Sequence, residues 1–193
     1  MGSALTPDFE LLIAQLASAL RAKQLRFMLI GGQAVLLHGE PRLTQDIDIT
    51  LAATPDRLDD LLALCDRLDM RPLPENVERF VHETFVLPVA AADTSMRVDF
   101  IFSSTPYEAQ AIERAVIVTL HDTPVPFASA EDLILHKLFA GRPRDIEDAA
   151  GVVRRKGTEL DWEYMQRWAR EFGAVPGREQ LPDLLDVLAR EPT

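Results

Sequence analysis

Apolar positions in the first third of the chain follow helical spacing first and strand spacing afterwards. Phe9 and Leu12 begin a series of apolar residues three or four positions apart, which predicts a helix over residues 7–24. Residues 26–30 form a short continuous apolar run that ends at a glycine pair, as a buried strand would. Residues 46–51 alternate polar and apolar side chains. This segment is therefore predicted to be a half-buried strand.

The rest of the chain divides into a mixed region and a helical region. Further strands are predicted over residues 81–89, 96–102, 116–120 and 124–128, and further helices over residues 33–38, from Thr54-Pro55 onward and after Pro106. Beyond Ser129 the pattern is helical only, over residues 130–140, 143–155, 161–172 and 178–190. The order predicts an α+β fold: a mixed sheet with flanking helices in residues 1–128, and an α-helical C-terminal region, residues 129–193, packed on that core.

Composition narrows the class of protein. Apolar residues make up 47% of the 193 residues and the formal net charge is −11, which argues against a broad electrostatic grip on nucleic acid or an anionic membrane. Local basic patches are still compatible with that charge. A single cysteine, Cys65, excludes an internal disulfide, and the sequence shows neither a signal pattern nor a membrane-length apolar run. We expect a soluble, cytoplasmic protein.

Three aspartates stand out because they lie in predicted strands. Asp46 and Asp48 are two positions apart, so their side chains leave the same face of one strand, and Asp99 lies amid apolar residues of a second strand. Carboxylates on a buried face need a compensating cation, and an all-oxygen site suits Mg²⁺ or Mn²⁺. Taken alone, Asp-x-Asp more often marks a solvated strand edge.

A glycine pair precedes the acidic strand. Gly31 and Gly32 lie between a predicted strand and a short helix, where backbone amides and the helix dipole favour a phosphate. Taken alone, the pair is better explained as a tight turn. The order of strand, glycine pair, short helix and acidic strand is the more specific signal.

This pattern resembles the nucleotidyltransferase fold of the DNA polymerase beta superfamily. The glycine pair, the Asp46-x-Asp48 strand and Asp99 correspond to that superfamily's glycine turn, acidic strand and third carboxylate. The chain has Gln33 after Gly32, whereas many members have Gly-Ser, which leaves no hydroxyl for phosphate at this turn. The resemblance implies two metal ions, Mg²⁺ or Mn²⁺, held by the three aspartates, and an NTP as donor.

The helical region resembles the branch that contains the AbiE-type abortive-infection toxins. Lys137 lies in an apolar helix, and Asp145 and Asp148 follow at helical spacing. A lysine in such a helix would by default reach solvent, but the resemblance implies that Lys137 contacts the triphosphate or the base. Asp145 could either cap its helix or hold Lys137 or an arginine. Arg142 could assist with phosphate.

Arg42 and Thr44 lie just before the acidic strand. Arg42 is expected to contact phosphate or base at the mouth of the site, with loop capping as its alternative, and Thr44 favours neither role. They complete the predicted nucleotide-binding set with Gly31, Gly32, Lys137 and Arg142.

Two functional hypotheses follow. The first is a metal-dependent nucleotidyltransferase that moves an NMP from an NTP to an acceptor hydroxyl and releases pyrophosphate. The resemblance implies an RNA acceptor, such as tRNA, and a separate antitoxin protein as partner, although a small molecule or a protein acceptor is compatible with the sequence. The second is a catalytically inactive module of the same fold that acts through a protein partner. A metal-dependent nuclease would use similar acids without the glycine pair.

Overall fold

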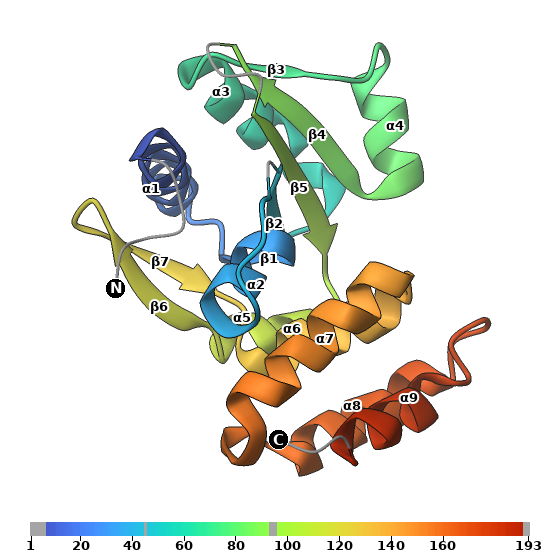
Figure 1. Ribbon diagram of the computed structural model, residues 1–193. Coiled ribbons are helices and arrows are strands. Elements are labelled where there is room, and N and C mark those ends of the chain that lie inside the picture. Colours follow the sequence, from blue (N-terminus) through green and yellow to red (C-terminus); the bar gives the residue numbers. More distant parts are fainter. Residues whose placement is uncertain (1–6, 45, 93–95, 191–193) are drawn as a thin grey trace.

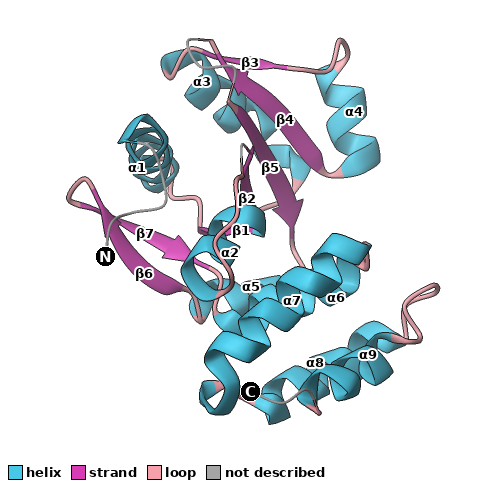
Figure 2. Cartoon of the chain, viewed as in Figure 1, coloured by secondary structure: helices cyan, strands magenta, loops and turns pink. Residues whose placement is uncertain are grey.

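The computed structural model describes residues 7–44, 46–92 and 96–190. Its strands are β1 (Phe27–Ile30), β2 (Asp46–Ala52), β3 (Met70–Pro72), β4 (Val86–Ala91), β5 (Arg97–Ser103), β6 (Val116–Leu120) and β7 (Thr123–Phe127). Its α-helices are α1 (Pro7–Ala22), α2 (Gly31–His38), α3 (Leu58–Arg67), α4 (Val77–Thr84), α5 (Pro106–Glu113), α6 (Ala130–Ala140), α7 (Pro143–Lys156), α8 (Trp162–Gly173) and α9 (Leu181–Ala189). Between β7 and residue 190, the last that the structure describes, only helices occur (Figure 2), so the predicted α+β order is confirmed.

The described strands form one mixed sheet in the order β3-β4-β5-β2-β1-β7-β6. The central strand β2 pairs antiparallel with β1 and parallel with β5. Beyond it, β4 is antiparallel to β5, and β7 is parallel to β1. The strands β2 and β5 are neighbours in the sheet although they lie about fifty residues apart in sequence.

Apolar residues cover both faces of the sheet. On β1, Phe27 and Leu29 belong to a core with α1 and α3, whereas Met28 belongs to a second core with the C-terminal helices. This split follows from the period of two along a strand. Residues of α2, Ala34 and Val35, also belong to the second core, and α6 and α7 pack on α2 (Figure 1). The boundary at residue 128 stays a prediction.

One predicted strand is partly wrong. Residues 81–84 lie in α4, and the strand begins only at Val86. Asn76 caps the helix by accepting a hydrogen bond from the backbone N–H of Arg79 at 3.0 Å, and Phe85 ends it with a left-handed φ of 58°. Val77 and Val81, one helical turn apart, pack on the first core, which explains why apolar residues here do not indicate a strand.

Smaller differences concern the ends of elements. The short strand β3 was not expected, α2 begins at Gly31 itself rather than at residue 33, and α9 begins at Leu181 rather than at residue 178. The sequence also favours Thr6 as N-cap of the first helix, because its hydroxyl precedes Pro7, but Thr6 lies outside the described residues. Among the described helices, none combines the length and apolar character needed to span a membrane.

Candidate active site

Strand pairing brings the three predicted aspartates onto one face of the sheet. Asp48 of β2 lies opposite Asp99 of β5, and Asp46 lies opposite Arg97. Paired residues point to the same side of a sheet, so three carboxylates and one guanidinium share a patch of two residues by two. The alternate residues of β2, such as Ile47, are fully buried on the other face. The core pattern thus fixes which way the carboxylates point.

The glycine pair lets this patch lie close to the start of α2. Gly31 has a φ of +61°, and a Cβ at this position would lie 2.8 Å from Cγ of Asp48. A Cβ on Gly32 would lie 2.8 Å from Cβ of Thr44. Gln33 adds a side-chain link, since its Nε2 donates to the backbone oxygen of Asp46 at 3.2 Å. The helix start, the loop before β2 and the acidic strand are therefore packed without space for a larger residue.

Replacing Gly31 by alanine should damage both the fold and the site. The left-handed φ alone costs on the order of 1–3 kcal/mol for a non-glycine residue, and the new methyl group would also push Asp48 away. Gly177 is the matched control, because its φ is +80° but no atom lies within 4 Å of a built Cβ. Chemical denaturation should therefore show a larger loss of stability for Gly31→Ala than for Gly177→Ala, and an equal loss would contradict the close packing.

Mutual repulsion and burial act on the central carboxylate. The pKa of Asp48 is raised, first by burial and then by the negative charges of Asp99 and Asp46, while Lys137 and Arg97 oppose the shift. Arg97 donates from Nε to Oδ1 of Asp99 at 2.8 Å, and that hydrogen bond is the main cause of the raised pKa of Arg97. Sequence analysis did not select Arg97. The sequence could have indicated it, because Arg97 is two positions before Asp99 and so lies on the same face of the strand.

The patch has the donor chemistry for a hard divalent cation. Its three carboxylates offer only oxygen ligands, which such a cation prefers. Burial and the two neighbouring carboxylates raise the pKa of Asp48, so a bound cation would stabilise its charged form. In their present arrangement, however, no three His, Cys, Asp or Glu side chains of the described residues converge as a metal site requires. Arg97 forms an ion pair with Asp99 that engages one oxygen of the third carboxylate. The carboxylates of Asp46, Asp48 and Asp99 are a donor set of the chemistry that such a cation takes.

Lys137 is the centre of a second, buried cluster of charges. Its Nζ lies 2.8 Å from Oδ1 of Asp145 and 2.8 Å from Oδ2 of Asp148. Arg42 donates through Nε and Nη2 to the two oxygens of Asp148, at 2.9 and 3.0 Å. These hydrogen bonds and charges lower the pKa of Asp148 despite its partial burial. The cluster joins α6, α7 and the loop before β2.

This geometry decides between the alternatives for Asp145. Oδ1 of Asp145 accepts from Nζ of Lys137 and Oδ2 accepts no hydrogen bond, so Asp145 holds the lysine rather than capping the helix. Arg142 is exposed, with Nε 3.2 Å from Oδ2 of Asp145. Thr44 makes only a 3.5 Å contact with the backbone oxygen of Asp46. Phosphate contacts by Lys137, Arg42, Thr44 and Arg142 stay predictions.

Comparison with protein families identifies the relatives of this fold. The model of the nucleotidyl transferase AbiEii toxin family, of a type IV toxin–antitoxin system, matches residues 15–191. The chain belongs to the AbiEii family. No curated protein sequence matches it.

Solved structures with the same fold are distant in sequence from this AbiEii-family chain. ANT(2″)-Ia in complex with adenylyl-2″-tobramycin has 20% identity and a TM-score of 0.57, covering 84% of this chain and 95% of that one. An antigenic nucleotidyltransferase-like protein from Paracoccidioides brasiliensis has 16% identity and a TM-score of 0.56, covering 92% and 91%. The lincosamide adenylyltransferase LnuA, lincomycin-bound, has 14% identity and a TM-score of 0.51, covering 74% and 94%. These likenesses confirm the nucleotidyltransferase-like fold.

Proposed function

We propose that this AbiEii-family chain is a metal-dependent nucleotidyltransferase that moves an NMP from an NTP to an acceptor hydroxyl. The observation that carries the proposal is the pairing of Asp48 with Asp99, with Asp46 on the same face and Gly31 directly against Asp48. Acids on a rigid sheet beside a helix N-terminus suit phosphoryl transfer, where positioning and charge stabilisation do most of the work. Membership of the AbiEii family supports the same class of reaction.

Each group has a role in this proposal. Asp46, Asp48 and Asp99 hold Mg²⁺ or Mn²⁺, which would neutralise phosphate charge and make the acceptor oxygen a better nucleophile. The acceptor oxygen forms a bond to the α-phosphorus, the bond from that phosphorus to the β-phosphate oxygen breaks, and pyrophosphate departs with the electron pair. Asp99 would help to activate the acceptor hydroxyl by receiving its proton and passing it to solvent.

The donor triphosphate would lie between the acidic patch and the start of α2. The backbone N–H groups of the helix start, at Gly31 and Gly32, are the proposed partners of phosphate oxygens. Lys137, Arg42, Thr44 and Arg142 complete the set. Since Lys137 is held by Asp145 and Asp148, it would contact phosphate by sharing its Nζ protons with the nucleotide rather than as a free cation.

The acceptor we propose is RNA, with tRNA as the first to test, and an antitoxin protein as a separate partner. The family description, a toxin of a type IV toxin–antitoxin system, supports the antitoxin. The formal net charge of −11 restricts RNA contact to local arginine-rich surface. The adenylyl-tobramycin and lincomycin bound by two structural neighbours make a small hydroxylated molecule the competing acceptor.

The test combines ligand binding with transfer. Thermal unfolding with Mg²⁺ or Mn²⁺ and each of the four NTPs should show stabilisation by at least one NTP, about 2.7 kcal/mol at one hundred times its dissociation constant. Transfer of α-phosphate label to tRNA, with release of pyrophosphate, should then require the metal. Asp99→Asn should lose transfer, whereas Asp59→Asn, an exposed acid on α3, should retain it.

Three results would contradict different parts of the proposed function. If no NTP stabilises the chain with either metal, the inactive binding module becomes the better description. If an NTP binds and pyrophosphate is released only with a small hydroxylated acceptor, the enzyme class stands and the RNA acceptor falls. Cleavage of RNA without NTP would instead indicate a nuclease.

A further inference from the structure

Arg97 stands inside the acidic patch as its fourth member. It lies opposite Asp46 across the β2–β5 pairing and two positions from Asp99 on its own strand. Its Nε donates to Oδ1 of Asp99 at 2.8 Å, and its charge also acts on the pKa of Asp48. Like charges this close need a counter-charge. In the arrangement seen here, Arg97 supplies it to Asp99, whereas the positive charge that most opposes the raised pKa of Asp48 is that of Lys137.

The same ion pair would compete with a metal ion for one oxygen of Asp99. An oxygen that accepts from a guanidinium has less charge to offer a cation, and the described acids do not converge around one point. Arg97 and a divalent cation are therefore alternative partners for Asp99. A ligand that draws the guanidinium away from Asp99 should therefore tighten metal binding, and the metal should tighten binding of that ligand by the same factor.

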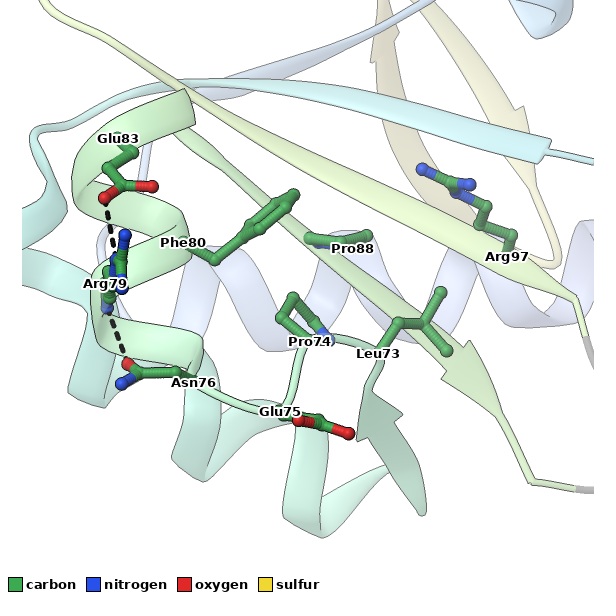
Figure 3. A pocket seen from close by; sticks show the side chains of 9 residues that line it. All are labelled: Leu73, Pro74, Glu75, Asn76, Arg79, Phe80, Glu83, Pro88 and Arg97. Carbon is green, nitrogen blue, oxygen red and sulfur yellow. Dashed lines mark hydrogen bonds and ion pairs between the residues drawn. The ribbon is translucent and has the colours of Figure 1, made fainter.

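Arg97 is also reachable from outside the patch. About half of its side chain is exposed, and it lines one end of a pocket of about 570 Å³ beside α4 (Figure 3). Pro88, which pairs with Asp99, and Phe80 of α4 give this pocket flat apolar surface. Arg79 lies on α4, where its guanidinium is paired with Glu83 at 2.8 Å (Figure 3). The pocket therefore has at one end Arg97, the residue whose guanidinium pairs with Asp99.

We propose that Arg97 is a displaceable counter-ion that couples binding of the acceptor to binding of the metal. A nucleotide end of the acceptor would place its base against Phe80 and Pro88 and its phosphate on Arg97, which releases Asp99 to the cation. This inference rests on the proposed function. It adds a coupling between two binding events to that function, because the metal binds more tightly when an acceptor that carries a phosphate is in the pocket.

The experiment measures Mn²⁺ affinity, not activity, by calorimetry or electron paramagnetic resonance. One probe is a trinucleotide with a free 3′ hydroxyl. The other is the nucleoside at its 3′ end, which carries no phosphate. In the wild-type protein the trinucleotide should tighten Mn²⁺ binding by about tenfold, within the usual range of coupling between sites, and the nucleoside should not. Reciprocally, Mn²⁺ should tighten trinucleotide binding by the same factor.

Two variants of the pocket test the role of Arg97. Arg97→Gln should bind Mn²⁺ more tightly than the wild type without any probe, and the trinucleotide should then have no further effect. Arg79→Gln removes an equal charge from the same pocket but leaves the pair of Arg97 and Asp99 intact, so it should behave like the wild type. A general electrostatic effect would move both variants alike and overturn the proposal.

The remaining outcomes separate this inference from the proposed function. Weaker or unchanged Mn²⁺ binding in Arg97→Gln, or coupling that survives in it, would overturn the counter-ion role while leaving the metal site. Wild-type protein that binds no Mn²⁺, or an Asp48→Asn variant that binds it as well as the wild type does, would overturn the metal site itself.

Discussion

Asp48→Asn should reduce nucleotidyl transfer by more than about a hundredfold, since even groups that only support a metal ligand typically contribute 10–100-fold. Asp48 lies between the other two acids: it is two positions from Asp46 and paired with Asp99. Asparagine keeps the shape of the side chain and its contact with Gly31 but removes the charge. The measurement is pyrophosphate release with saturating NTP, together with the thermal shift given by metal and NTP.

The same substitution should stabilise the protein when no metal is present. Because the folded state raises the pKa of Asp48 above its ordinary value of 3.8, the folded protein holds that proton more tightly than the unfolded one. Stability is therefore lost as the pH rises through the raised pKa, and the penalty is complete above it. Asparagine carries no such penalty.

In a chelating buffer at neutral pH, Asp48→Asn should consequently unfold at a higher temperature than the wild type. The gap should narrow as the pH falls towards 3.8 and the wild-type carboxyl takes up its proton. Groups far from Asp48 that titrate in this range are common to both proteins and cancel in the difference. A variant that is inactive and also less stable at neutral pH would indicate that Asp48 supports the fold rather than a metal.

The part of the site that sequence could predict is the part encoded by short-range patterns. The alternation of β2 predicts that Asp46 and Asp48 share a face, and strand, glycine pair, helix and acidic strand follow within about twenty residues. The pattern also gives the order of elements. It failed at residues 81–84, where a cap at Asn76 and the contacts of Val77 and Val81 outweigh an apolar run.

The ion pair of Arg42 with Asp148 could not be predicted, because it joins residues that are far apart in sequence and meet only in the folded chain. Arg42 and Asp148 are 106 residues apart in sequence, yet they form a two-point ion pair. Arg42 seemed an exposed loop residue available to phosphate, and its engagement follows only from the packing of α7 beside the loop. For Arg97, the strand pattern shows that it shares a face with Asp99. The pattern does not show whether the guanidinium pairs with Asp99 or with Asp46.

Lys137→Met should lower the free energy of unfolding by about 3–5 kcal/mol, the usual cost of removing one partner from a buried ion pair. The exposed fractions of the side chains of Lys137, Asp145 and Asp148 are 10%, 10% and 7%. Methionine fills a similar volume but leaves two carboxylates without their shared cation. Lys156→Met is the matched control, because Lys156 pairs with the exposed Glu159 and such pairs contribute about 0–1 kcal/mol.

A second substitution separates the loss of charge balance from the loss of packing. Asp145→Asn added to Lys137→Met should recover part of the stability, because it removes a buried carboxylate that would keep only the exposed Arg142 as partner, while Arg42 still holds Asp148. The cluster should also weaken in acid: the lowered pKa of Asp148 gives stability that is complete above its ordinary value of 3.8 and is lost as the pH falls below it.

Nucleotide binding by the double variant then tests the proposed contact with phosphate. If Lys137 serves the triphosphate as well as the fold, the double variant should regain stability without regaining its thermal shift with metal and NTP. A full return of that shift would confine Lys137 to holding α6 against α7. The proposed phosphate partners would then be the start of α2 at Gly31 and Gly32, together with Arg42, Thr44 and Arg142.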